Sequence, residues 1–367
     1  MECSTWFSEL PDDLKEEALS YLPAESFCRY RGVCKEWNAL ISSTKFVTND
    51  WLAAPPNRKP WLVFCQDPNL LSCMAYNFFT NTWKRFSFDF LKNGYELWIH
   101  GSAAGLFLTS GSISAYTVSN PLTGKSLELP RINTFTAIKA MTIVAVEGQG
   151  HNGETYKVIA VTMLGNEQRV EIYDSCLKSW TTAGHLPRNL WFFQARIVIS
   201  EDFLYYHGIE VDSFTRCIVA FSVQNGTSIF VPLPLHLQGE SYNNRCDVLF
   251  TCGSRVLLGT SKPDVIIIWE LEKPRLGLNN LEVREIARMP PSVLEDLKRK
   301  EGSSFDSFKF SFEGMRDMVY IRNVNEVLVY NLSTNIWKWL PRRSDRGPNL
   351  DFISDIFIFE PRPDMKV

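Results

Sequence analysis

The chain has 367 residues, of which 45% are hydrophobic and 22% charged, and its formal net charge is −3 at pH 7. These proportions are typical of globular proteins with a sizeable core, so they argue against a largely disordered chain. The small net charge gives no overall electrostatic attraction to nucleic acids or membranes. At this length we expect one small domain and one large domain.

The nine cysteines are scattered and never spaced as Cys-x-x-Cys. Their odd number and spacing argue against a disulfide framework and a zinc site, so we expect reduced thiols and no metal or other cofactor. The chain starts without a basic stretch before an apolar run, and no segment has the roughly 18 uninterrupted apolar residues of a membrane span. We therefore expect the protein in the nucleus, the cytoplasm or both, with no membrane partner and no direct nucleic-acid partner.

A helical pattern occupies the first fifty residues. Pro11 suits the first turn of a helix, and the acidic residues that follow it complement the positive end of the helix dipole. The sequence predicts a helix over residues 11–21, which Pro23 ends. A second helix is expected over residues 25–32 and a third over residues 35–43.

Two apolar stripes run along these predicted helices. One recurs at i, i+4 and i+8 and consists of Leu14, Ala18 and Leu22. The other consists of Val33, Trp37, Leu40 and Ile41. Because three short helices form a marginal unit, something must cover one apolar face. On physical grounds alone, the stripes pack either against each other or the following domain, or against a partner protein.

The order and spacing of these residues, from Leu10-Pro11 to Val33-Cys34-Lys35 and Trp37, resembles the F-box. The family role of that module is to bind a Skp-family adaptor and, through it, the cullin and RING subunits of a ubiquitin ligase. The resemblance implies adaptor-binding candidates at Leu10, Pro11, Leu14, Leu19, Leu22, Phe27, Val33, Cys34 and Trp37. Phe27 stands where the family more often has leucine. For Leu19 and Trp37 the alternative is that they hold the three helices together.

A proline-rich stretch separates the helical segment from the rest of the chain. It divides the sequence into an F-box at residues 1–50, a linker at 51–60 and a large domain at 61–367. In the large domain, short runs of β-branched and aromatic residues alternate with Gly, Asn, Asp and Pro turns. This alternation indicates an all-β architecture.

Five segments of the large domain repeat one motif, in which a turn residue is followed six positions later by Trp or Ser. The pairs are Asn77 and Trp83, Asn120 and Ser126, Asp174 and Trp180, Ser222 and Ser228, and Asn331 and Trp337. A sixth unit, around Trp269, has a longer gap. A period of about 45 to 60 residues is typical of propeller blades. We expect the Trp, or the residue that replaces it, on the fourth strand of each blade.

This repeat resembles the kelch-like repeat of plant F-box proteins, although the chain lacks the Gly-Gly doublet of the strict kelch pattern. In the fifth unit, four strands are expected over residues 248–252, 255–259, 265–270 and 281–289. The expected fold is an α+β multidomain chain, with a three-helix F-box before an all-β six-bladed propeller of four-stranded blades. The first blade has only three strands of its own, so we expect residues 351–359 to complete it, which would protect both edges.

Loops on one face of the propeller are candidate substrate contacts, because binding residues often lie on loops over a rigid scaffold. Two of these loops combine aromatic residues with arginine, as interface hot spots do. The candidates, all on these loops, are Arg188, Trp191, Phe192, Tyr242, Asn243 and Arg245. The alternative for residues 191–193 is that they enter the next inner strand and pack in the core. Residues 294–300 predict a short surface helix.

The resemblance implies a substrate-recognition subunit of an SCF (Skp-cullin-F-box) ubiquitin ligase, whose propeller binds a target protein for ubiquitination and proteasomal degradation. An alternative is a non-degradative scaffold or transcriptional co-regulator that uses the propeller as an interaction platform. A third is a propeller enzyme. The sequence contains no Gly-x-Ser-x-Gly elbow, Walker loop or dinucleotide fingerprint, so we expect a non-catalytic subunit.

Overall fold

The structure is a computed structural model of the whole chain. It describes residues 10–22, 26, 30, 33–41, 43, 46, 59–67, 72–87, 98–111, 115–132, 136–146, 155–233, 246–273, 282–306, 310–342, 355–363 and 365–367.

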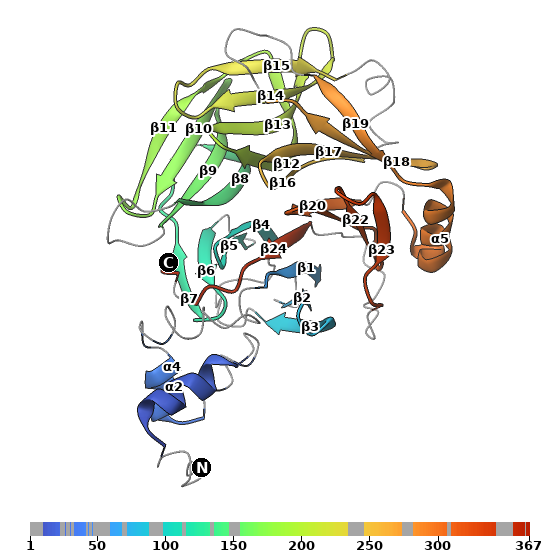
Figure 1. Cartoon of the computed structure of the whole chain (residues 1–367). Helices are drawn as coiled ribbons and strands as arrows, with labels where there is room; N and C mark the ends of the chain where they lie inside the picture. The colour runs from blue at the N-terminus through green and yellow to red at the C-terminus, as the bar shows by residue number, and fades with distance from the viewer. Residues whose placement is uncertain are drawn as a thin grey trace. The chain divides into compact units, whose positions relative to one another are not determined.

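Two α-helices lie near the N-terminus: α2 (Asp12–Ser20) and α4 (Lys35–Ile41) (Figure 1). They confirm the first and third predicted helices. α2 is one residue shorter than expected at each end, while α4 starts at the expected residue and ends two residues early. Pro11 directly precedes α2, and its carbonyl oxygen accepts a hydrogen bond from the backbone N–H of Lys15 at 3.0 Å. Proline at this position removes a donor that would have no partner within the helix.

The predicted second helix is described only in part. Ser26 and Tyr30 are helical. The rest of residues 25–32, including Phe27, lies outside the described residues, as do residues 51–58 of the expected linker.

After residue 60 the chain forms six four-stranded sheets, which are the blades of a β-propeller (Figure 1). Blade 1 combines β1 (Trp61–Asp67), β2 (Ser72–Asn77), β3 (Thr82–Ser87) and β24 (Ile356–Phe359). The strands of blades 2 to 4 are β4 (Trp98–Ala103), β5 (Leu106–Ser110), β6 (Tyr116–Asn120), β7 (Lys125–Glu128), β8 (Ala137–Val146), β9 (Thr155–Leu164), β10 (Glu167–Asp174), β11 (Ser179–Leu186), β12 (Leu190–Ser200), β13 (Phe203–Glu210), β14 (Arg216–Ser222) and β15 (Ser228–Pro232). Those of blades 5 and 6 are β16 (Cys246–Cys252), β17 (Arg255–Lys262), β18 (Val265–Leu271), β19 (Val283–Arg288), β20 (Ser311–Met315), β21 (Met318–Arg322), β22 (Val327–Asn331) and β23 (Ile336–Trp339).

The C-terminal strand completes the first blade, as predicted. The order of that sheet is β24-β1-β2-β3, so the last strand of the chain pairs with β1. Phe359 on β24 is fully buried, and its ring lies 4.9 Å from that of Phe107 and 5.7 Å from that of Trp61, measured between centroids. Residues 351–354, the first part of the predicted strand, lie outside the described residues.

The chain divides into two compact units. The first consists of residues 1–129, 145–155 and 357–367, and the second of residues 130–144 and 156–356. In the first unit, one apolar cluster contains residues of the N-terminal helices together with residues of blades 1 and 2. Its buried members are Leu19, Ile41, Phe46, Trp61, Val63, Cys73, Ala75, Phe107, Leu122, Phe357 and Phe359.

The repeated turn residue has the same structural role in several blades. In blade 1, Oδ1 of Asn77 accepts hydrogen bonds from the backbone N–H of Phe79 at 2.8 Å and of Thr80 at 3.2 Å. In blade 6, Oδ1 of Asn331 accepts the equivalent pair from residues 333 and 334, both at 2.9 Å. An Asx turn of this kind fixes the hairpin between the third and fourth strands.

The six-residue offset places Trp opposite the residue that precedes the turn. Tyr330 pairs with Trp337 across β22 and β23, and their ring centroids are 4.5 Å apart. The Tyr330 hydroxyl donates to Oδ1 of Asn335 at 2.7 Å, and Asn335 has a φ of 57°. The repeat is therefore a cross-strand aromatic pair joined to a turn, which confirms that Trp lies on the fourth strand.

A largely buried ionic cluster in the second unit joins blades 4 and 6 to the residue before β24. Arg196 on β12 donates from Nη1 to the carbonyl oxygen of Phe312 at 3.1 Å and from Nη2 to the carboxylate of Glu313. Nη1 lies 3.8 Å from Oδ1 of Asp355, which also accepts from the Ser311 hydroxyl at 3.3 Å. The side chains of Arg196 and Glu313 are each 14% exposed.

Candidate adaptor-binding site and substrate-facing loops

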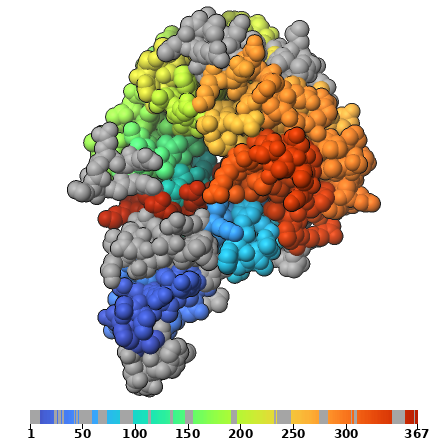
Figure 2. Space-filling view, viewed as in Figure 1, coloured from blue at the N-terminus to red at the C-terminus, as the bar shows by residue number. Residues whose placement is uncertain are grey.

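An uncovered apolar stripe runs along α2. Leu14, Ala18 and Tyr21 follow each other at i, i+4 and i+7, and all three are exposed, Leu14 by 46% and Tyr21 by 63%. Pro11, one turn before Leu14, is exposed as well. Figure 2 shows the segment of α2 and α4, in blue, at the surface of the face in view. Such a stripe on a short helix is typical of a surface that binds a partner.

The sequence pattern placed Leu22 on this stripe and did not select Tyr21. The helix ends at Ser20, so the helical period no longer applies at position 22. Leu22 is partly buried and packs against the apolar cluster of the first unit. The spacing i, i+7 from Leu14 is the signal that could have identified Tyr21.

Four of the predicted interface positions face the core. Leu19 is 2% exposed and belongs to the apolar cluster of the first unit, and the partly buried Leu10, Leu22 and Trp37 pack against that cluster. Trp37 also stacks on Tyr30, with 5.4 Å between ring centroids. This placement favours the alternative in which Leu19 and Trp37 hold the helices together.

The segment before α4 divides its residues between the surface and the helix end. Val33 is 44% exposed, so it faces solvent as Leu14 does. Cys34 is half-buried, and its Sγ accepts a hydrogen bond from the backbone N–H of Trp37 at 3.4 Å. Cys34 thereby satisfies one of the free donors at the start of α4, which is the role of a helix cap.

A buried lysine connects the two helices. The side chain of Lys15 on α2 is 7% exposed, and its Nζ lies 2.7 Å from Oε1 of Glu36 on α4 and 3.3 Å from Oδ1 of Asp12. The hydrogen bond to Glu36 is the main cause that raises the pKa of Lys15 above its ordinary value, and burial opposes it. Lys15 is therefore charged at neutral pH and is paired on both sides.

Among the substrate candidates, Arg188 has the clearest surface position. It lies between β11 and β12, its side chain is 75% exposed, and its Nη2 is 3.1 Å from Oε1 of Glu167. Glu167 also pairs with Nη2 of Arg169 at 2.7 Å. Arg169, and more weakly Arg188, lower the pKa of Glu167. The ion pair of Arg188 with Glu167 links two connections of the chain. Arg188 lies between β11 and β12, and Glu167 begins β10 directly after the β9–β10 turn.

The neighbouring turn between β13 and β14 adds an exposed aromatic side chain that the sequence did not single out. Phe214 is 66% exposed and has a φ of 52°, a left-handed conformation that is unusual for a bulky residue. The turn is joined to the connection that carries Arg188, because the backbone N–H of Val211 donates to the carbonyl oxygen of Asn189 at 2.7 Å.

Of the other substrate candidates, the structure describes only the backbone of two. Trp191 and Phe192 lie in β12, where they pair with Ile209 and Gly208 of β13, so the chain does enter the inner strand there. Their side chains lie outside the described residues, and so do Tyr242, Asn243 and Arg245 entirely.

The predicted surface helix is present as α5 (Pro291–Glu301), in the connection from β19 to β20. Its apolar side chains Leu294 and Leu297 are buried in a cluster of blades 5 and 6. Its charged side chains form i, i+3 ion pairs, such as Lys298 with Glu295 at 2.8 Å. This arrangement supports a packed surface helix over a nucleic-acid patch.

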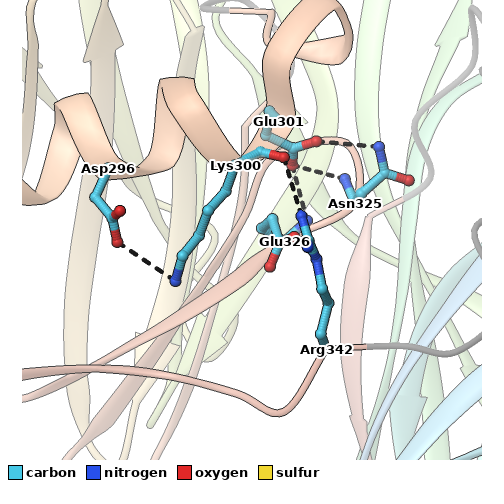
Figure 3. Close-up of polar contacts among 6 residues, drawn as sticks. All are labelled: Asp296, Lys300, Glu301, Asn325, Glu326 and Arg342. Atoms are coloured by element: carbon cyan, nitrogen blue, oxygen red, sulfur yellow. Dashed lines mark hydrogen bonds and ion pairs between the residues drawn. The ribbon is translucent and has the colours of Figure 1, made fainter.

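The end of α5 is fixed to blade 6 by a buried carboxylate (Figure 3). Glu301 is 5% exposed and accepts hydrogen bonds from the backbone N–H groups of Asn325 and Glu326, both at 2.7 Å. Arg342 donates to Oε1 of Glu326 at 2.8 Å and to the carbonyl oxygen of Lys300 at 3.3 Å. These contacts hold α5 rigidly beside the loops of blade 6.

Two further findings concern the described residues as a whole. No helix within the described ranges is long and apolar enough to cross a membrane. In the same ranges, no group of three His, Cys, Asp or Glu side chains is arranged to hold a metal ion.

The comparisons with known proteins agree with this architecture. Residues 7–49 match the family model described as F-box domain. F-box only protein 6 of Arabidopsis thaliana is 28% identical over 99% of this chain and 75% of its own length. An F-box/kelch-repeat protein of the same plant is 26% identical over 90% and 84%, and F-box only protein 13 is 24% identical over 96% and 84%.

The matched F-box segment contains both helices and the exposed stripe, and the relatives align along the propeller as well as the helices. This combination indicates a substrate-adaptor role, with a Skp-type partner for the helices and a target for the propeller. The chain thus combines an F-box domain with a six-bladed β-propeller, and it is similar to plant F-box and F-box/kelch-repeat proteins.

Proposed function

We propose that the chain is the substrate-recognition subunit of an SCF ubiquitin ligase. The F-box binds a Skp-family adaptor and, through it, the cullin and RING subunits, while the propeller binds a protein for ubiquitination and proteasomal degradation. The observation that best supports this proposal is the exposed stripe of Leu14, Ala18 and Tyr21, which lies inside the F-box match.

In this function the chain forms and breaks no bonds. It holds a target lysine near the ubiquitin thioester of the conjugating enzyme, which makes an encounter between two molecules nearly intramolecular. The rigid strands of the blades and the anchored α5 suit this task, because a firmly held target keeps its lysine within reach.

We propose that the protein acts in the nucleus, the cytoplasm or both. Among the described residues, Cys34, Cys73, Cys176, Cys217 and Cys252 are reduced cysteines. Burial raises the pKa of Cys217 to about 12 and that of Cys252 to about 11. These buried thiols are therefore protonated at neutral pH. Reduced cysteines are usual in the nucleus and the cytoplasm, and they support this part of the proposal.

The test replaces one exposed residue in the full-length chain. Leu14→Glu puts a charge into the proposed adaptor surface, and we expect it to abolish co-purification with a Skp-family adaptor while the propeller still captures its targets. The matched control is Leu177→Glu, because Leu177 is 68% exposed on the β10–β11 turn and lies outside the residues of the F-box match. We expect the control to retain the adaptor.

The same variants test whether binding leads to degradation. Proteins captured by the wild-type propeller should carry more ubiquitin and have shorter lifetimes than those captured by Leu14→Glu. Equal lifetimes and equal ubiquitin loads would refute the degradation function and support a non-degradative scaffold. Retention of the adaptor by Leu14→Glu would refute the assigned surface.

A further inference from the structure

The exposed apolar residues of the F-box come from two separate chain segments. Leu14 and Tyr21 belong to α2 and its C-terminal end, whereas Val33 precedes α4. A partner that contacts both segments needs them at a fixed separation, because loosely held contact residues lose affinity through the entropy of ordering them.

Lys15 and Glu36 are positioned to fix the distance between these two segments. Lys15 adjoins Leu14 in the sequence, and Glu36 lies three residues after Val33. Their side chains meet at 2.7 Å. The ion pair therefore connects the two segments beside their exposed apolar residues.

The burial of the two partners is unequal. The Lys15 side chain is 7% exposed, while that of Glu36 is 49% exposed and that of Asp12 is 83% exposed. A lysine is rarely this buried unless it is paired. Its aliphatic stem is enclosed, and only its charged end is bound by carboxylates on two helices. The enclosed stem therefore fixes the position of the ammonium group, which an ion pair between two exposed side chains does not.

Two alternatives to lysine would preserve the fold of α2, but only one of them would preserve this connection. Methionine fills a similar volume and favours helix as strongly, yet it cannot bind a carboxylate. Arginine is longer and can bridge both Glu36 and Asp12. The two substitutions therefore separate the packing of the stem from the bridging by the charge.

We propose that Lys15 is a positioning residue of the adaptor-binding surface, which bridges α2 to α4 and sets the separation between the stripe on α2 and Val33. The inference rests on the proposed function, because it assumes that the partner of this surface is a Skp-family adaptor. Lys15 itself need not touch the adaptor.

The first test measures the affinity of the full-length chain for a purified Skp-family adaptor by calorimetry. We expect Lys15→Met and Glu36→Gln each to weaken binding roughly tenfold, the scale of a coupling between neighbouring groups. Lys15→Arg should restore binding to about the wild-type value. The matched control is Lys35→Met, since Lys35 is an exposed lysine on α4, and it should bind as wild type.

The second test does not depend on the adaptor. Amide hydrogen exchange in the free full-length chain should become several-fold faster over α4 in Lys15→Met and in Glu36→Gln, but not in Lys15→Arg or Lys35→Met. Should Lys15→Met unfold the helices, Glu36→Gln, at a half-exposed position, gives the same comparison.

The outcomes distinguish this inference from the proposed function. Wild-type affinity in Lys15→Met and Glu36→Gln, or unchanged exchange over α4, would overturn the positioning role while leaving adaptor binding intact. A wild-type chain that binds no Skp-family adaptor would overturn the proposed function, and the role of Lys15 in an adaptor surface with it. The exchange measurement would then still decide whether Lys15 connects the helices.

Discussion

Replacing Arg196 by methionine should destabilise the propeller by removing the centre of its buried ionic cluster. Methionine retains much of the apolar volume of the side chain, so the loss is mainly electrostatic. Glu313 would then remain 14% exposed without its guanidinium partner. Burial is the main cause that raises the pKa of Glu313, and the charge of Arg196 opposes that rise.

The magnitude follows from the three contacts that Arg196 makes. Removing one partner of a buried ion pair costs about 3–5 kcal/mol, which applies to Glu313. The hydrogen bond to the carbonyl oxygen of Phe312 adds about 1 kcal/mol. The contact with Asp355 is 3.8 Å long and 42% exposed on the carboxylate side, so it adds less than about 1 kcal/mol. Together these terms predict that the free energy of unfolding falls by about 4–6 kcal/mol.

The double variant Arg196→Met with Glu313→Met makes the argument sharper. With both charges gone, only the half-exposed carboxylate of Asp355 has lost its partner, and the expected loss falls to about 1–2 kcal/mol. The measurement is urea unfolding followed by tryptophan fluorescence. Arg288→Met is the control, because Arg288 pairs with Glu285 on the surface, and it should change stability by less than about 0.5 kcal/mol.

The dependence on pH gives an independent check. A carboxylate whose pKa is raised in the folded state contributes stability below its unfolded pKa, and this contribution is lost as the pH rises through the folded pKa. In Arg196→Met the pKa of Glu313 should rise further, so acidification from pH 7 to pH 5 should recover part of the lost stability relative to wild type. A loss below about 1 kcal/mol, a double variant as unstable as the single one, or no recovery in acid would refute the reasoning.

Three other substitutions test the first unit. Phe359→Ala removes a fully buried ring that stacks on Phe107, so thermal unfolding should show a loss of about 3–5 kcal/mol, and a loss under about 1 kcal/mol would contradict the closing role of β24. Tyr21→Ser should weaken adaptor binding in calorimetry roughly tenfold or more, whereas Leu177→Ser should not, and equal affinities would remove Tyr21 from the surface. Asn120→Asp keeps the acceptor that forms the turn but loses the amide donor to the C-terminal segment. Hydrogen exchange over residues 361–367 should therefore become faster, and unchanged exchange would contradict a role of Asn120 in holding this segment.

The repeat was predictable because its cause is local. Asn77 and Asn331 make the same turn, and a turn of fixed length always places the fourth-strand residue opposite the residue before it. An offset in the sequence therefore corresponds directly to a cross-strand pair. The fifth blade shows the limit of this rule, because Trp269 pairs with Glu285 and not with a nearby Trp. Its longer connection removes the fixed offset but leaves the four strands.

The contacts that close the fold had no such local signal. Arg196 and Glu313 are 117 residues apart in the sequence. Each is a charged residue in a strand, and nothing in the sequence near either one indicates that the two form a pair. The close packing beneath them is equally hidden: a side chain at Gly314 would collide with the carbonyl oxygen of Thr251 on the neighbouring inner strand. The requirement for glycine at position 314 follows only from the close approach of blades 5 and 6.

The F-box shows how a family pattern combines two physical roles. The nine positions that the resemblance implied include exposed residues such as Leu14 and Val33 and core residues such as Leu19. A pattern of apolar residues cannot separate these groups, because both the partner and the core select for apolar side chains. Burial in the structure separates them, and it adds Tyr21, which the pattern omits. The surface that remains is smaller than the motif, and it depends on residues such as Lys15 that the motif does not contain.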